Sequence, residues 1–216
     1  HSPAIFGDRL ASPIVIRSLD MRVSGDPEIN RTSTVLLKEP VQKFLEHVSV
    51  LGVLEVLGVA GIDKNEPFDV SPYAHGTFQF FLRNPICQEM GRKFKISFSS
   101  SEDDTALSYI HDLGFIAKLK DGKRGFKVML GGGLGSQPRH ADELYDFLPA
   151  EELLSLIEGV LRVFDRHGER AKRLKARMKF LIKDIGKDAF MELVSEQSTA
   201  LSKNHPEFEV EKFEGA

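Results

Sequence analysis

The stretch that most constrains the fold is Gly91 to Ser100, which reads Gly-Arg-Lys-Phe-Lys-Ile-Ser-Phe-Ser-Ser. Polar and apolar residues alternate strictly here, and successive side chains of a β-strand point to opposite faces of the sheet. The alternation therefore predicts a strand with one core face and one polar face. The core face would hold Phe94, Ile96 and Phe98. The polar face would hold Lys93, Lys95, Ser97 and Ser99.

Two lysines on one strand face can form an anion site. Lys93 and Lys95 would project in the same direction about 7 Å apart, two strand rises. That spacing suits one small oxyanion or two carboxylates of a larger ligand. The alternative is a half-exposed strand whose lysines serve only to keep the protein soluble.

Composition excludes several kinds of site. The chain has 216 residues, enough for one large domain or two small ones, and its net charge of -3 gives no global attraction to nucleic acid or anionic lipid. Its one cysteine, Cys87, excludes an intrachain disulfide, a cysteine-rich zinc site and an iron–sulfur cluster held by this chain alone. The longest apolar run, Val48 to Ile62, is too short to span a bilayer, and no signal peptide is evident. We therefore expect a soluble cytoplasmic protein.

The elements around the central strand follow from turn and capping signals. Ser71 and Pro72 favour a helix start, and that helix would end near Asn84. A second helix of about ten residues is expected from Ser101 to Leu113, ended by Gly114. Asp121-Gly122 predicts a hairpin between strands 113–120 and 124–130. The order is then strand, helix, strand, strand.

A glycine run, Gly131-Gly-Gly-Leu-Gly135, follows this hairpin, with Arg139 just beyond it. Glycine allows positive φ and lets backbone approach a ligand closely. The run matches neither a Walker loop nor a dinucleotide fingerprint. Either a ligand loop or a tight crossing between two elements accounts for it.

Helices are expected in the C-terminal part, over 150–166 and 188–201, with a strongly basic segment between them. On a helix, the basic segment would present one cationic stripe, with Arg173 and Arg177 beside it. The stripe would consist of Lys172, Lys175, Lys179 and Lys183. A solvated face is the ordinary role for such a stripe, and it lacks the interleaved aromatic residues typical of nucleic-acid binding. Further short elements are expected at 13–16, 34–37, 41–50 and 208–213.

Eight ordered blocks in the chain resemble the first siroheme-binding half of ferredoxin-type sulfite and nitrite reductases. The resemblance covers roughly residues 61–194, about 134 of 216. The blocks are Asp69-Val-Ser-Pro-Tyr-Ala74, Gly91-Arg-Lys-Phe-Lys-Ile96, His111-Asp-Leu-Gly-Phe-Ile116, Gly125-Phe-Lys-Val128, Gly131-Gly-Gly-Leu-Gly135, Pro138-Arg139, Val163-Phe-Asp-Arg-His-Gly-Glu-Arg170 and Lys175-Ala-Arg-Met-Lys-Phe180.

The resemblance implies an α+β fold: a strand-helix-strand-strand sheet module followed by two or three helices. It implies siroheme bridged to a four-iron four-sulfur cluster, and six-electron reduction of sulfite to sulfide or nitrite to ammonia. Lys93 and Lys95 match the paired lysines that line the family's anion pocket and supply protons. The cofactor-binding candidates it implies are Arg92, Gly131, Gly132, Gly133, Arg139, Arg170, Arg173, Arg177 and Lys179.

Two departures from the family pattern shape the functional expectation. The segment Val48 to Ala60 lacks the arginine and asparagine of the family, and the cysteines of the cluster belong to a second half that is not in this chain. We therefore expect residues 61–201 to form the family domain, after a poorly matched segment 1–60 and before a tail or linker 202–216. The chain would be a fragment or a diverged remnant that supplies the lysine side of the pocket and is inactive alone.

Its expected partners are the missing half or a partner subunit, and ferredoxin or a flavoprotein as electron donor. A non-catalytic module that binds a tetrapyrrole or another polyanion is the alternative from a different class. Nucleic-acid binding through the cationic stripe is a third, weaker alternative.

Overall fold

The computed structural model describes residues 53–57, 60, 63–82, 84–87, 90 and 92–202. Its contacts divide the chain into two units, His1–Glu46 and His47–Ala216, and all described residues belong to the second. The short elements expected at 13–16, 34–37, 41–50 and 208–213 lie outside these residues.

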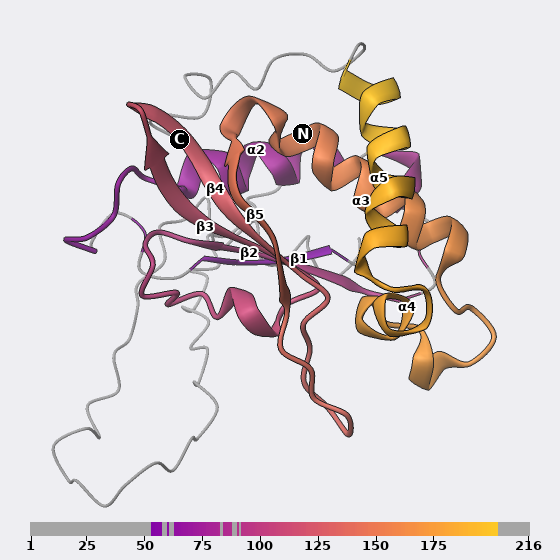
Figure 1. The fold of residues 1–216 in the computed structure, drawn as a ribbon. Coiled ribbons are helices and arrows are strands. Elements are labelled where there is room, and N and C mark those ends of the chain that lie inside the picture. The colour runs from indigo at the N-terminus through magenta and orange to yellow at the C-terminus, as the bar shows by residue number, and fades with distance from the viewer. Residues whose placement is uncertain are drawn as a thin grey trace, which may run out of the picture. The chain divides into compact units, whose positions relative to one another are not determined.

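The second unit is built on a five-stranded mixed sheet in the order β1-β2-β3-β4-β5 (Figure 1). The strands are β1 (Val53–Leu57), β2 (Phe94–Ser99), β3 (Leu113–Lys120), β4 (Lys123–Leu130) and β5 (Asp142–Pro149). β1, β2 and β3 run parallel, whereas β3, β4 and β5 are antiparallel neighbours. The central alternating stretch is thus an inner strand of the sheet, and the α+β class is confirmed.

The predicted hairpin between β3 and β4 is confirmed. Its two turn residues, Asp121 and Gly122, have φ of 52° and 74°. Two successive left-handed residues are what a two-residue hairpin with the sheet's right-handed twist requires, and Asp-Gly is among the sequences that adopt it most readily.

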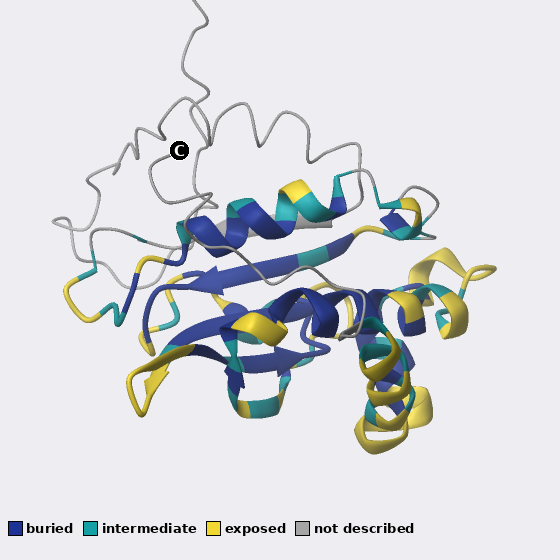
Figure 2. Ribbon diagram, turned by 90° about the horizontal axis from the view of Figure 1, so that it is seen from above, coloured by how far each residue is buried: buried dark blue, intermediate teal, exposed yellow. Residues whose placement is uncertain are grey.

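The helices are α2 (Ser71–Phe81), α3 (Leu153–His167), α4 (Met178–Ile185) and α5 (Lys187–Ser202). Figure 2 shows that α2 and α3 are largely buried, whereas α5 exposes much of its surface. Aromatic rings fill the core beneath α2: Phe98 stacks on Phe115 at 5.1 Å between centroids, and Phe126 meets both edge-on. The expected helices over 71–84, 150–166 and 188–201 are therefore present with modest shifts at their ends.

The prediction of a helix from Ser101 to Leu113 is wrong. Turns and a short 3₁₀ segment, η3 (Ser108–Ile110), occupy this stretch, and Gly114 lies within β3. Asp104 and Leu107 take left-handed backbone conformations, with φ of 48° and 55°, which a helix cannot contain. The Asp104 carboxylate accepts hydrogen bonds from the Ser99 hydroxyl at 2.5 Å and the Ser108 N–H at 2.8 Å, so the side chain replaces helical backbone bonds.

The same segment covers most of the polar face of β2. Ser97, Ser99 and Ser108 are fully buried, and their hydroxyls bond to one another at 3.3–3.4 Å. The polar face of β2 is exposed only toward its beginning, where the lysines lie.

The prediction of one continuous cationic stripe is also wrong. A 3₁₀ turn, η5 (Arg173–Lys175), precedes α4, which begins only at Met178. A continuous helix would turn Leu174 away from the lysines and into the core, but Leu174 is 88% exposed. Lys179, expected on the solvated stripe, is 4% exposed. The nucleic-acid alternative rested on that stripe and loses its basis.

β5 was not expected from the sequence. Its pairing with β4 shifts register between Phe126 and Val128 and again between Val128 and Met129. In β5 apolar residues are adjacent in sequence, as Leu144-Tyr145 and Phe147-Leu148, and do not alternate with polar ones. The register shifts accommodate such pairs within the strand, but the alternation that identifies a strand is lost.

Phe94 tests the core face of β2. Its side chain is fully buried, and its ring lies 5.6 Å from that of Phe164. We expect Phe94→Ala to lower the free energy of unfolding by about 3–5 kcal/mol, because the truncation leaves a cavity. Leu119→Ala, at an exposed position of β3, is the control and should change it by about 0.5 kcal/mol or less. Similar small losses in both, measured by urea unfolding, would contradict the burial of Phe94.

Candidate anion and cofactor site

The two lysines of β2 lie on its polar side, as the alternation predicts. Lys93 is exposed just before the strand, and Lys95 is partly buried within it. The Lys95 ammonium makes no hydrogen bond or ion pair with any residue that the structure describes. Burial lowers the pKa of Lys95, and the positive charges of Lys93 and Arg177 lower it further. Lys95 is therefore a cation whose charge a bound anion would stabilise.

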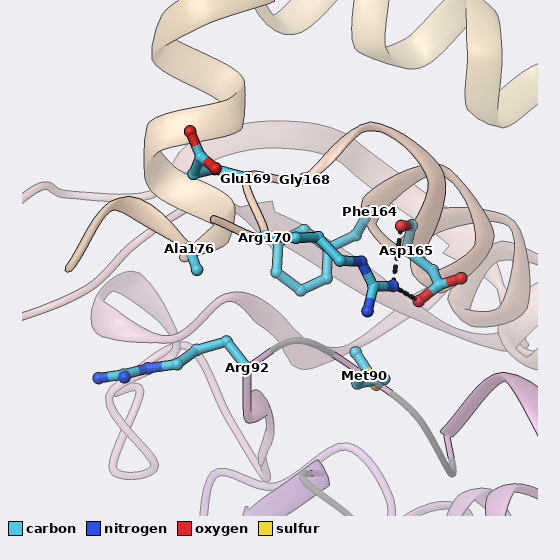
Figure 3. A pocket seen from close by; sticks show the side chains of 8 residues that line it. All are labelled: Met90, Arg92, Phe164, Asp165, Gly168, Glu169, Arg170 and Ala176. Atoms are coloured by element: carbon cyan, nitrogen blue, oxygen red, sulfur yellow. Dashed lines mark hydrogen bonds and ion pairs between the residues drawn. The ribbon is translucent and has the colours of Figure 1, made fainter. Parts of the chain in front are cut away.

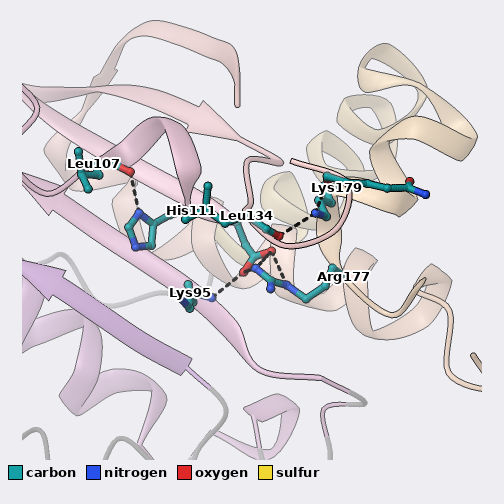
Figure 4. A network of polar contacts seen from close by, with 8 residues as sticks. Lys95, Leu107, His111, Leu134, Arg177 and Lys179 are labelled. Carbon is teal, nitrogen blue, oxygen red and sulfur yellow. Dashed lines mark hydrogen bonds and ion pairs between the residues drawn. The ribbon is translucent and has the colours of Figure 1, made fainter. Parts of the chain in front are cut away.

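A buried carboxylate joins Lys95 to the C-terminal helices (Figure 4). Asp112 is 1% exposed and precedes β3 directly. Its Oδ2 accepts the backbone N–H of Lys95 at 3.1 Å and one guanidinium N–H of Arg177 at 3.0 Å. Its Oδ1 accepts from Nε and Nη2 of Arg177 at 3.3 and 3.2 Å. Asp112 thereby brings together two candidate residues that lie 82 positions apart in sequence.

Asp112 was not among the candidate residues, although it stands in the His111-Asp-Leu-Gly-Phe-Ile116 block. Burial raises the pKa of its carboxyl group, while the Arg177 charge and hydrogen bonds and the Lys95 N–H oppose that rise. A polar residue directly before an apolar strand was the only available signal, because its partner lies far along the chain.

Lys179 supports the glycine run and is not free. Its ammonium donates to the carbonyl oxygens of Leu134 at 2.9 Å and Gln137 at 2.6 Å (Figure 4). Burial lowers the pKa of Lys179, and the neighbouring Arg177 lowers it further. These contacts anchor the loop after β4 onto α4.

The glycine run crosses closely over neighbouring backbone. A Cβ at Gly132 would lie 2.4 Å from the Tyr109 carbonyl oxygen, so any larger residue would clash. Gly131 has φ of 77°, and its N–H donates to the Asp112 carbonyl oxygen at 2.9 Å. Gly133 pairs with Arg139 in an isolated bridge. This geometry fits the tight-crossing interpretation, and the ligand role of the three glycines stays a prediction.

Two more candidate arginines bond within the chain. Arg139 donates to the Gly131 carbonyl oxygen at 2.8 Å and to Asp142 Oδ2 at 2.5 Å. Arg170 pairs with Asp165 at the end of α3. Arg173, in contrast, lies exposed on η5.

Arg92 lies at a small hollow beside the strand (Figure 3). Its Nε is buried and has no hydrogen-bond partner among the residues that the structure describes. The cavity of about 10 Å³ is lined by Met90, Arg92, Phe164, Asp165, Gly168, Glu169, Arg170 and Ala176. An unpaired buried N–H is costly, so Arg92 is a donor in need of an acceptor.

The structure thus separates the candidates into four sets. Lys95, Arg177, Lys179 and the glycine run converge around Asp112, whereas Arg92 and Arg170 line the small hollow. Lys93 and Arg173 are exposed, and Arg139 is bonded behind the glycine run.

Other chemistry is not apparent in the described part of the chain. Its residues contain no group of three histidine, cysteine or acidic side chains that could hold a metal. Burial raises the pKa of the Cys87 thiol to about 12, so this cysteine is an unreactive core residue. None of the described helices is long and apolar enough to cross a membrane.

Asp112→Asn tests the buried ion pair. We expect it to lower the free energy of unfolding by about 3–5 kcal/mol, because it leaves the mostly buried Arg177 cation without its counter-charge. Asp146→Asn is the matched control, because Asp146 pairs with Lys118 at a much more exposed point of the same sheet. The free energy of unfolding should therefore fall by about 1 kcal/mol or less. Equal losses in denaturant unfolding would show that Asp112 contributes no more than a surface pair.

Comparison with known proteins gives a consistent result. The model of the family "Nitrite and sulphite reductase 4Fe-4S domain" matches residues 53–201. A sulfite reductase [ferredoxin] of Mycolicibacterium paratuberculosis is 31% identical over 140 residues, which are 64% of this chain and 25% of that protein. The chloroplastic ferredoxin–nitrite reductase of Arabidopsis thaliana is 32% identical over 139 residues, 61% of this chain and 23% of that protein. The chain thus spans about a quarter of the length of these relatives.

Solved structures agree. The Mycobacterium tuberculosis NirA protein matches with a TM-score of 0.61 and 29% identity, over 68% of this chain and 27% of that one. A dissimilatory sulfite reductase I matches with a TM-score of 0.55 over 67% of this chain and 52% of that one; at 13% identity this likeness shows the fold alone. Because the family model covers more than half of the chain, the protein belongs to the nitrite and sulphite reductase 4Fe-4S domain family.

Proposed function

We propose that this chain supplies the lysine-bearing wall of the siroheme and anion pocket of a sulfite or nitrite reductase. The observation that carries the proposal is the pairing around Asp112. It holds Arg177 beside Lys95, while the Lys95 ammonium has no acceptor among the described residues. Two adjacent cations with one counter-charge leave net positive charge at this point, which suits an oxyanion.

The residues present also fit siroheme, a tetrapyrrole with many carboxylates. Arg92 offers a buried N–H that has no acceptor among the described residues, while Lys93 is exposed just before β2 and Arg173 is exposed on η5. Carboxylates would satisfy these donors with charge-assisted hydrogen bonds. When bound, siroheme supplies the iron that takes the anion and delivers electrons to it.

The chain's own lysines would serve the chemistry in two ways. Lys93 and Lys95 would balance the charge of sulfite or nitrite, which lowers the cost of holding an anion at a partly buried site. Each ammonium is also a proton donor, and protons are needed where oxygen leaves as water.

The electron supply must come from elsewhere. These 216 residues contain one cysteine, which is buried, so they do not by themselves hold a four-iron cluster. The second half of the pocket, or a partner subunit, would carry the cluster. The donor would be ferredoxin or a flavoprotein, since relatives are named as ferredoxin and NADPH enzymes. We therefore expect no turnover from the chain alone, and sulfite reduction at a normal enzyme rate with a chemical reductant would contradict this.

Sulfate titration tests the lysine site directly. We expect Lys95→Met and Lys93→Met to weaken sulfate binding by roughly tenfold or more, since a hydrogen bond to a charged group contributes about 1.5–3 kcal/mol. Lys64→Met, at an exposed lysine in a turn, should leave affinity unchanged. Calorimetry or chemical-shift titration gives the affinities. Equal affinity in all three variants would remove the anion site.

The pH dependence of sulfate binding provides a second test. Lys95 binds an anion well only while protonated, and burial together with Lys93 and Arg177 lowers its pKa from the usual 10.5. As pH rises through this lowered pKa, the proton is lost and affinity should fall, at lower pH than for an ordinary lysine. The Lys95→Met variant should lack this component of the pH profile. A wild-type profile that coincides with that of the variant would contradict a role for Lys95.

A non-catalytic polyanion- or tetrapyrrole-binding module is the second candidate. It is favoured by the internal pairing of Arg139, Arg170 and Lys179, which leaves fewer cations for a cofactor. A visible absorbance spectrum separates the reductase pocket from a module that binds another polyanion. Uptake of added siroheme supports the reductase pocket, whereas colourless protein that fails to take it up favours a module for a different polyanion.

A further inference from the structure

His111 is a buried titratable group that the proposed pocket does not use. It precedes Asp112 in sequence, and its side chain is 6% exposed. Figure 4 shows its ring between Leu107 and Lys95. Lys95 is also among the charges that act on the imidazole, so the two groups are electrostatic neighbours.

The hydrogen bonding of the ring fixes its tautomer. Nδ1 lies 2.7 Å from the Leu107 carbonyl oxygen, and a carbonyl only accepts, so Nδ1 carries the hydrogen. In the neutral ring Nε2 is then an unprotonated acceptor. No described residue donates to Nε2.

Burial favours the neutral form of the ring. Burial lowers the pKa of His111, and the Lys95 cation acts in the same direction. The Leu107 carbonyl and the carboxylates of Asp112 and Asp104 oppose this, but burial is the largest influence. His111 is thus a neutral base held next to a lysine whose own pKa is lowered.

From this arrangement we propose that His111 is the proton-relay residue of Lys95. The proposal depends on the proposed function only for the reason why Lys95 would need a new proton. Once the Lys95 ammonium has given a proton to a departing oxygen, it is a neutral amine. Nε2 of His111 takes a proton from a hydronium ion of the solvent, which is left as water, and the resulting imidazolium passes that proton to the amine. The imidazole is neutral again, the ammonium is restored, and one proton has moved from solvent to Lys95.

The competing role is structural. The Nδ1–H of His111 satisfies the carbonyl of Leu107, a residue in left-handed conformation where the chain turns into η3. A residue that only holds this turn would need the Nδ1 hydrogen bond and make no use of Nε2. His111→Asn separates the two roles, because the asparagine amide can donate to Leu107 from the Nδ1 position but has no basic nitrogen.

The test measures proton exchange with water at the Lys95 ammonium, by NMR of the full chain labelled with ¹⁵N-lysine. In wild type we expect the exchange rate to rise with pH through the titration of His111. In His111→Asn this inflection should vanish, and the rate should fall at least about tenfold, a conservative figure beside the roughly 10²–10⁴-fold that positioned acid–base groups give. His140→Asn is the control, since His140 is exposed and stacks on Tyr109, and it should leave the rate unchanged.

Two results would overturn the proposal. One is a Lys95 exchange rate that His111→Asn leaves unchanged while the variant stays folded. The other is a ¹⁵N spectrum that places the ring hydrogen on Nε2. If His111→Asn unfolds the chain, the wild-type exchange profile and the tautomer still decide the question. None of these measurements needs siroheme or sulfite, so a failed relay and a failed anion site give different results.

Discussion

The architecture of the site depends on one buried ion pair. Asp112 lies where β3 begins and accepts both the Lys95 N–H of β2 and the guanidinium of Arg177, which precedes α4. The carboxylate replaces a strand hydrogen bond and supplies a counter-charge at the same time. Such a pair is costly to bury, and it repays that cost only when its remaining hydrogen bonds are made, as they are here. The pair therefore fixes where the sheet and the C-terminal helices meet.

Local signals were sufficient for the elements whose pattern is self-contained. The alternation of β2, the Asp121-Gly122 turn and the amphipathic pattern of α3 each specify their structure within a short stretch. The segment 101–111 could not be predicted in this way. The Asp104 carboxylate accepts a hydrogen bond from Ser99, the last residue of β2. Asp104 and Leu107 have left-handed backbone conformations, which replace the helix that the apolar spacing indicated. Side-chain hydrogen bonds between residues 99 and 108 overrode the helix preference there.

The candidate site was predictable to a similar extent. The lysines of β2 followed from alternation, and the arginines came from a family resemblance. Their partners did not follow from either, because Asp112, Asp142 and the loop carbonyl oxygens bind their cations through contacts that only the folded chain creates. A charge pattern read along the sequence counts cations but does not reveal which are already neutralised.

That distinction bears on the function of the pocket. Arg139, Arg170, Arg177 and Lys179 have acceptors within the chain, so they order the loop and helices around the pocket. Among the described residues, the Lys95 ammonium has no acceptor and Arg92 retains a buried N–H without one, whereas Lys93 is exposed. A cation paired with a carboxylate is held in place, but the two charges largely cancel and attract a ligand only weakly. An unpaired, partly buried cation attracts anions, and a bound anion would offset the free-energy cost of burying its charge. Under the proposed function, the first group would provide rigidity and the second would provide affinity for an anion.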